Sequence, residues 1–162
     1  IASSDRTNPL LEKLWHSGVV HVTFTALPES SESEAVANVE RAEDLGMISG
    51  VRGMCPWLQS PGLTDRLALA GVDYLLLPWI DPPDRSSIEP CIDACRKWEI
   101  CPAVEIPLMK RTVTVLDHAL TELMKAGVKN VFYYEITSSH QSDGLEPKTI
   151  IEAAVHEEDL SQ

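Results

Sequence analysis

Residues 71–83 read GVDYLLLPWIDPP, and this stretch decides how the rest of the chain is interpreted. Its middle, Tyr74–Leu77, is a short apolar run with Gly71 on one side and prolines on the other. A run of this length between turn-forming residues predicts a strand buried on both faces rather than a helix. Such strands are typical of parallel sheets, whose crossover helices cover them. Because Pro78 has no N–H to donate, we expect the strand to end there and residues 79–81 to lie in the loop beyond it.

The same unit recurs along the chain. Leu-Gly-Met at 45–47 and Ala-Gly-Val at 70–72 and 126–128 each mark the end of a helix before a strand. Strand starts recur about every 28 residues, which predicts β/α units in a parallel sheet with right-handed crossovers. The predicted strands are Val19–Thr25, Met47–Arg52, Tyr74–Leu77, Cys101–Pro107 and Asn130–Thr137. The predicted helices are Asn8–Gly18, 34–45, Leu63–Ala70, Ile88–Trp98, Thr112–Ala126 and Pro147–Val155.

Two architectures fit this pattern: an open doubly wound sheet and an incomplete barrel. Five strands are too few for a closed eight-stranded barrel. A flat sheet covered on both sides should be apolar on both, and an unpaired carboxylate in a dry core costs several kcal/mol. One predicted face is nevertheless polar: His21, Thr23, Thr25, Arg52, Glu105, Tyr133, Glu135 and Thr137. We therefore favour an α/β fold with a partial TIM-type barrel of about five strands, outer helices and a polar concave face.

Length and charge limit the classes of partner. The 162 residues fit one domain, 1–162, and the absence of an initial Met predicts a piece of a longer protein. Thirteen basic and twenty-five acidic residues give a net charge of −12, which repels nucleic acid and anionic membrane surfaces. No signal peptide is visible, and no apolar run approaches the roughly 20 residues that span a bilayer. Four cysteines in apolar segments are typical of reduced thiols, so we expect a cytoplasmic protein.

The three clustered cysteines do not predict a metal site. Cys91, Cys95 and Cys101 have the spacing C-x3-C-x5-C, which matches no common zinc pattern. Cys91 and Cys95 lie one turn apart on a predicted helix, and Cys101 opens the next strand. We expect buried structural thiols and assign no metal ligand.

The carboxylates of the predicted concave face are the candidates for chemistry. Glu105 and Glu135 lie on neighbouring strands, where they are expected to face each other. With His21 they are candidates for general acid–base catalysis or for holding a hard divalent metal. The alternative is that a basic side chain neutralises the glutamates and the set only fills the concave face: Arg52, Lys110 or Arg111. Trp57 and Trp79 either form an aromatic wall over a ligand or cover the core.

The order of parts resembles the partial (β/α)6 barrel of the radical S-adenosylmethionine enzymes. In that family a helix leads to a strand that ends in Gly-Gly-Glu-Pro; here Asn8–Gly18 leads to a strand followed by TALP at 25–28. Val51–Gly53 is similar to the family's next strand end. Residues 70–73 and 79–82 are similar to the unit that follows, and 126–135 to the one after it. The resemblance implies S-adenosylmethionine and a 4Fe–4S cluster as cofactors, with an N-terminal segment to hold the cluster. It gives four candidate cofactor-binding residues: Thr25, Arg52, Trp79 and Asp81.

The chain also departs from the family pattern. The C-x3-C-x2-C cluster motif is absent, and Leu27 stands where the family has the glutamate that binds the cofactor's amino group. The resemblance therefore implies a truncated or degenerate domain that is not active alone.

Three functions stay open from the sequence. One is the radical S-adenosylmethionine-like domain, and the second is a metal-dependent aldolase or isomerase piece that uses Glu105, Glu135 and His21. The third is a non-catalytic scaffold or binding module that self-associates, since a sheet of about five strands leaves an edge to cover. We expect a small-molecule ligand on the concave face and a homo-oligomer as partners.

Overall fold

The computed structural model describes residues 4–26, 31–80, 85–135 and 150–154, and these residues form one sheet with helices alternating along it. The strand order is β1-β2-β3-β4-β5-β6; β1 to β5 run parallel, and β6 runs antiparallel to β5. The strands are β1 (His21–Thr25), β2 (Ile48–Arg52), β3 (Tyr74–Pro78), β4 (Cys101–Leu108), β5 (Asn130–Glu135) and β6 (Ile150–Ala154). The helices are α1 (Ser4–His16), α2 (Glu32–Asp44), α3 (Cys55–Leu58), α4 (Leu63–Leu69), α5 (Glu89–Lys97), α6 (Lys110–Val113) and α7 (Leu116–Lys125), with a short 3-10 turn η1 (Arg85–Ser87).

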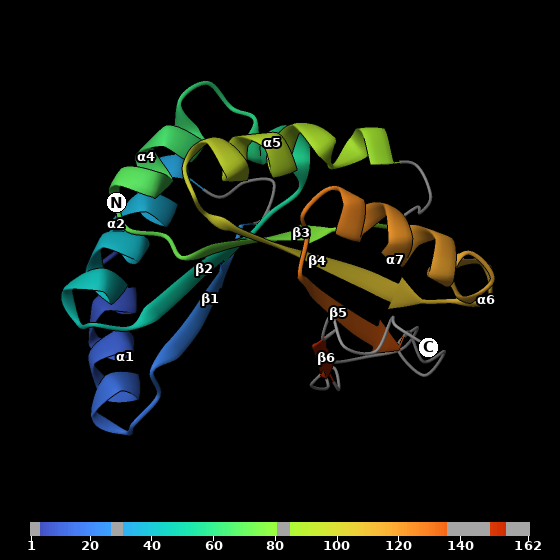
Figure 1. Cartoon of the computed structure of the whole chain (residues 1–162). Helices are drawn as coiled ribbons and strands as arrows, with labels where there is room; N and C mark the ends of the chain where they lie inside the picture. Colours follow the sequence, from blue (N-terminus) through green and yellow to red (C-terminus); the bar gives the residue numbers. More distant parts are fainter. Residues whose placement is uncertain (1–3, 27–30, 81–84, 136–149, 155–162) are drawn as a thin grey trace.

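The two faces of the sheet differ in their surroundings. On the outer face, strand residues pack against the helices and form the main hydrophobic core: Val51, Leu75, Leu77, Val104, Ile106 and Val131. In Figure 1 the helices lie along this outer side of the curved sheet. The inner face carries the alternate residues, and those of β1, His21, Thr23 and Thr25, are exposed. Helices on one side and a partly exposed face on the other are what the alternation of the sequence predicted.

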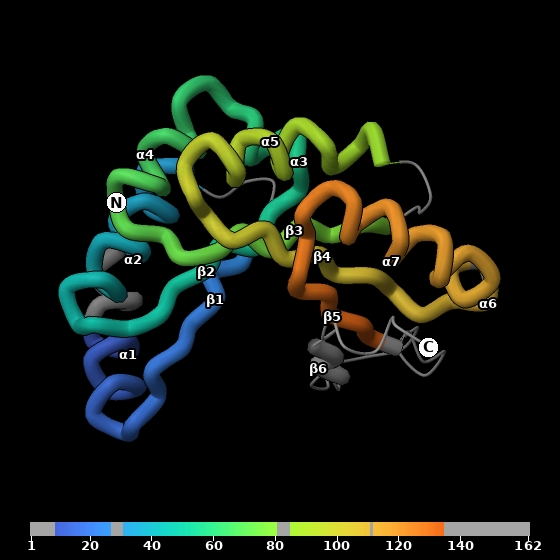
Figure 2. Tube along the Cα trace, viewed as in Figure 1, coloured from blue at the N-terminus to red at the C-terminus, as the bar shows by residue number. Residues whose placement is uncertain are grey.

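The predicted α/β fold class is confirmed: five parallel strands in the order β1-β2-β3-β4-β5 alternate with helices that pack on the outer side of the sheet. Among the described strands, β1 and β6 form the two edges of the sheet. Figure 2 shows the chain curving from β1 to β5, so that the inner face is concave.

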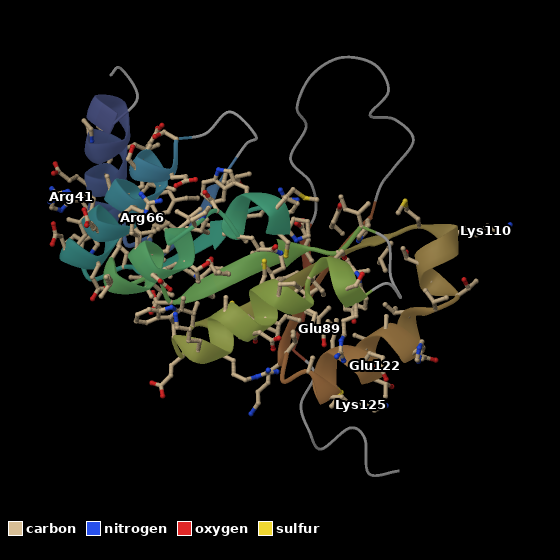
Figure 3. All side chains as sticks on the ribbon, turned by 90° about the horizontal axis from the view of Figure 1, so that it is seen from above. Arg41, Arg66, Glu89, Lys110, Glu122 and Lys125 are labelled. Carbon is tan, nitrogen blue, oxygen red and sulfur yellow. The ribbon has the colours of Figure 1, made fainter. Side chains whose placement is uncertain are left out.

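Ion pairs tie neighbouring helices together on the outer side. Arg85 pairs with Glu89 of α5, and its Nη1 lies 3.6 Å from Oε2 of Glu122 on α7; the two glutamates lie close together in Figure 3. Arg66 of α4 pairs with Glu32 at the start of α2. These pairs are part-exposed and belong to the helical layer, well away from the concave face.

The C-terminal element differs from the prediction. A helix was expected at Pro147–Val155, but residues 150–154 form strand β6, which pairs with β5 from Asn130↔Ala154 to Tyr134↔Ile150. The free edge of β5 offers backbone donors and acceptors that an isolated helix does not use, so tertiary pairing overrides local preference. The short helix α3 was also missed, because four residues give too little periodicity to detect. The single helix predicted at Thr112–Ala126 is divided into α6 and α7.

Candidate functional site

Three strands bring polar side chains to one part of the concave face. Arg52 ends β2, Glu105 lies in the second half of β4, and Tyr134 is the next-to-last residue of β5. Arg52 is in register with Leu76 of β3, and Glu105 is in register with Pro78 of the same strand. The Arg52 side chain therefore crosses β3 to reach Glu105, over two strand spacings of about 4.8 Å each.

Arg52 and Glu105 form a direct ion pair. Arg52 Nε donates a hydrogen bond to Glu105 Oε2 at 2.6 Å, and the two side chains are 27% and 9% exposed. A charge-assisted hydrogen bond of this kind compensates part of the cost of burying the carboxylate. The sequence-based alternative in which Arg52 neutralises the glutamate is confirmed. Glu105 is therefore not a free carboxylate.

Sequence reasoning missed Tyr134. It is half-buried, and burial raises the pKa of its phenol; the negative charge of Glu105 raises that pKa further, and Arg52 opposes the rise. The phenol thus stays protonated at neutral pH and is close enough to the ion pair to sense both charges. The signal was available in the alternation of β5, where the apolar Val131 shares a face with Tyr133 and leaves Tyr134 for the other.

The predicted pairing of Glu105 with Glu135 is wrong. Glu105 is in register with Phe132, whereas Glu135 is in register with Leu108. Leu108 lies three residues beyond Glu105, an odd offset, so the two positions belong to opposite faces of β4. Tyr133 was assigned to the polar face by the same reasoning, but it packs against the outer core. The predicted alternation of β5 is displaced by one residue, and a shift of one residue exchanges the two faces of a strand.

His21 lies at the opposite end of the concave face from the ion pair. It opens β1 in register with Ile48, four residues before the level of Arg52. At about 3.3 Å per residue this is roughly 13 Å along the strands. The catalytic set proposed from the sequence is therefore not assembled around Glu105.

A tyrosine fills the amino-terminal part of the concave face. The ring of Tyr74 lies against Gly50, where a Cβ would be 2.1 Å from Tyr74 Cζ. Its hydroxyl makes a 2.5 Å hydrogen bond with Thr23 Oγ1, and its ring meets His21 edge-on at 5.2 Å between centroids. Burial raises the pKa of the Tyr74 phenol, against the hydrogen bond to Thr23, which lowers it. Because Gly50 has no side chain, it makes room for this ring.

Two of the four cofactor-binding candidates share the concave rim. Thr25 is exposed and is in register with Arg52, so both lie on the inner face. Asp81 lies outside the described residues.

Trp79 is not at the rim. Its side chain is fully buried within the outer core, and its backbone N–H donates to the backbone carbonyl of Glu105 at 2.8 Å. Backbone hydrogen bonding to β4 continues past Pro78, because successive residues of a strand hydrogen-bond in turn to the strands on its two sides. Leu76 O accepts from Gly53 N, so Pro78 faces the β2 side, where β2 has already ended. Core cover is thus the role of Trp79, and Trp57 packs against the same core.

The expectation of buried thiols is confirmed for Cys91 and Cys95 but is wrong for Cys101, which is exposed. Cys55, Cys91 and Cys95 are buried in the outer core, and Cys101 is exposed where β4 begins. Asn130 Nδ2 donates to Cys101 Sγ at 3.0 Å. Burial raises the pKa of the Cys95 thiol to about 12. Within the part of the chain that the structure describes, no three His, Cys, Asp or Glu side chains converge on a point where a metal would sit. An iron–sulfur cluster needs several converging thiolates, so these residues do not fit one.

Comparison with known proteins adds no family. No protein-family model matches the chain, and no curated protein matches its sequence. What stands is a sheet of five parallel strands with alternating helices, together with the geometry of its concave face. Among the described residues, no helix is both long and apolar enough to cross a membrane.

Proposed function

We propose that the chain is a β/α half-barrel domain that binds a small polar molecule on its concave face. The observation that carries the proposal is the Arg52–Glu105 ion pair, built across β3 at the carboxyl ends of the strands. Parallel α/β proteins bind ligands at this edge, because their loops and strand ends meet there. A part-exposed guanidinium held at a fixed point is a ready anchor for a polar ligand.

The similarity to radical S-adenosylmethionine enzymes supports the choice of S-adenosylmethionine as the first ligand to test. Thr25 and Arg52, two of the residues that the resemblance implies, share the inner face at the rim. The described cysteines do not fit the cluster, so the domain is proposed to bind without performing the radical reaction. The aldolase or isomerase alternative is not pursued, because Glu105 is ion-paired and His21 lies far along the sheet.

The test is calorimetric titration with two probes, S-adenosylmethionine and 5′-methylthioadenosine, which lacks the amino acid part. We expect at least one probe to bind the wild-type chain. Glu105→Gln should change its affinity, because the fixed position of Arg52 depends on this carboxylate. Arg66→Gln is the matched control: it also removes one charge of an Arg–Glu pair, but on α4 in the helical layer. Equal effects of the two variants, or no binding of these probes or of the amino acid probes described below, would overturn the proposal.

A further inference from the structure

Among the residues that the structure describes, the guanidinium of Arg52 has donors to spare. Its Nε is the atom bound to Glu105, and its two terminal nitrogens make no hydrogen bond or ion pair with another residue that the structure describes. The Arg52 side chain is 27% exposed, so part of it borders the concave side. The two terminal nitrogens of an arginine form a planar fork that matches the two oxygens of a carboxylate.

The charge balance around this fork selects against a simple anion. Arg52 and Glu105 together are neutral, so a bound monoanion would leave one uncompensated negative charge beside a carboxylate that is 9% exposed. Uncompensated charge in such surroundings is costly. The net charge of −12 also repels anions at longer range. A ligand that carries one charge of each sign leaves the site neutral and is not repelled.

Apart from Thr25 and Tyr134, the described side chains beside the pair on the inner face are apolar. Leu76 and Pro78 of β3 lie on the inner face beneath the Arg52 side chain, and Phe132 of β5 is in register with Glu105. All three are half-buried, so part of each remains in contact with the concave space. An apolar group placed here would gain about 25 cal/mol of binding free energy for each Å² of apolar surface that it removes from water.

We propose that the ligand is an apolar α-amino acid zwitterion, alone or as part of a larger molecule. Its carboxylate binds the terminal nitrogens of Arg52, its ammonium lies beside Glu105, and its apolar body covers Leu76, Pro78 and Phe132. This inference rests on the proposed function, since it names the class of molecule that the concave face binds.

Three compounds that share the same apolar group distinguish the contributions of the ammonium and of the carboxylate to binding. L-phenylalanine carries both, phenethylamine only the ammonium, and 3-phenylpropanoate only the carboxylate. In calorimetric titrations of the whole chain we expect L-phenylalanine to bind about tenfold more tightly than either single-charge compound, from one added charged hydrogen bond. L-leucine and L-methionine extend the test to other apolar side chains.

The Glu105→Gln variant gives the decisive reversal. It retains a side chain that can hydrogen-bond Arg52 but removes the negative charge, so the site becomes cationic. We expect 3-phenylpropanoate to gain and L-phenylalanine to lose affinity, so that their order inverts. Arg66→Gln removes an ion pair on α4 and should leave the order unchanged.

The outcomes separate the two proposals. If 3-phenylpropanoate binds wild type as tightly as L-phenylalanine, or if 5′-methylthioadenosine binds while none of the three amino acids does, the zwitterion is wrong and the concave-face function stands. If the five compounds of this subsection, 5′-methylthioadenosine and S-adenosylmethionine all fail to bind the wild-type chain at millimolar concentration, both proposals fall. Unfolding midpoints of the two variants show whether each is folded.

Discussion

The ring of Tyr74 occupies the space directly over Gly50, so close that a Cβ at position 50 would lie 2.1 Å from Tyr74 Cζ. The contact joins β2 to β3 and, through the hydroxyl of Tyr74, reaches Thr23 of β1. One glycine therefore lets an aromatic ring lie flat on the inner face and fill it from β1 to β3.

Replacing Gly50 should displace this ring. Gly50→Ala is expected to lower the free energy of unfolding by about 1–3 kcal/mol, since the added methyl overpacks the site. Tyr74→Leu in the Gly50→Ala background should recover part of the loss, because the clashing ring is gone. Tyr74→Phe keeps the ring and removes only the hydrogen bond to Thr23, at about 1 kcal/mol. Urea unfolding of the four proteins checks these values; a Gly50→Ala variant as stable as wild type would contradict the packing.

Removing Arg52 and removing Glu105 should lower the free energy of unfolding by different amounts. Arg52→Ala leaves a carboxylate that is 9% exposed without its partner, whereas Glu105→Ala leaves an arginine that is 27% exposed and long enough to reach water. We expect losses of about 3 kcal/mol for Arg52→Ala and about 1 kcal/mol for Glu105→Ala. Arg52→Met with Glu105→Leu should cost less than Arg52→Ala alone. Equal losses for the two alanine variants would show that burial does not set the cost.

Alkaline pH should destabilise the fold through Cys95. Burial raises the pKa of this thiol from 9.0 to about 12, so the unfolded chain loses the proton first as pH rises. Stability is therefore full below pH about 9 and falls toward pH about 12, by at most about 1.4 kcal/mol per pH unit for this group. Urea unfolding of wild type, Cys95→Ala and Cys95→Val at several alkaline pH values should show a shallower slope in both variants. An unchanged slope would contradict the role of Cys95 and leave the effect to the other groups with raised pKa values: Cys55, through its hydrogen bond with Cys91 and its burial, and Tyr74, Tyr133 and Tyr134, through burial.

Acid should weaken the contact between α4 and the end of α5. Trp98 Nε1 donates to Asp65 Oδ1 at 2.5 Å, and this hydrogen bond, followed by that from Lys97, lowers the pKa of Asp65 below its ordinary value of 3.8. The stabilisation is therefore present above the unfolded pKa and is lost as pH falls through the lower folded value. An NMR titration of the Asp65 carboxyl should give a higher pKa in Trp98→Phe than in wild type. Lys97→Gln should produce a smaller rise; the reverse order would contradict the assigned cause.

Among the strands that the structure describes, β1 has a neighbour on one side only, and this open edge predicts self-association. Val20 O accepts from Ile48 N and Ala26 N donates to Arg52 O, so even-numbered residues of this strand bond to β2. Odd-numbered residues then point their backbone groups to the free edge, where a second copy can pair with them. We expect a concentration-dependent dimer by light scattering, and a monomer for Thr25→Pro, which removes one outward N–H. A wild-type chain that is monomeric at all concentrations would show that the edge is not used.

Much of the fold could be predicted because its signals are local. The glycine punctuation at 46, 71 and 127 and the apolar run at 74–77 predicted the order of strands and helices, and the alternation of β1 predicted an exposed inner face. Each of these depends on residues within one unit, so no knowledge of the rest of the fold was needed.

The site was harder to predict, because strand register decides which of its residues lie side by side. Arg52 was named as a partner of Glu105 and is one. Glu135 was predicted to face Glu105, but only the pairing of β4 with β5 decides which of their residues lie opposite each other. Trp79 follows the end of β3, as predicted, but its burial in the outer core depends on how the helices pack over that side of the sheet. Likewise, residues 150–154 became a strand because β5 offered a free edge.

The sequence by itself determined the β/α repeat, the parallel sheet and the excess of negative charge, since periodicity and composition are properties of neighbouring residues. Only the tertiary structure decided that Arg52 reaches across β3 to Glu105, that Tyr134 lies near them, and that Tyr74 covers Gly50. These contacts join residues on different strands, and a shift of one residue in register would have replaced every one of them.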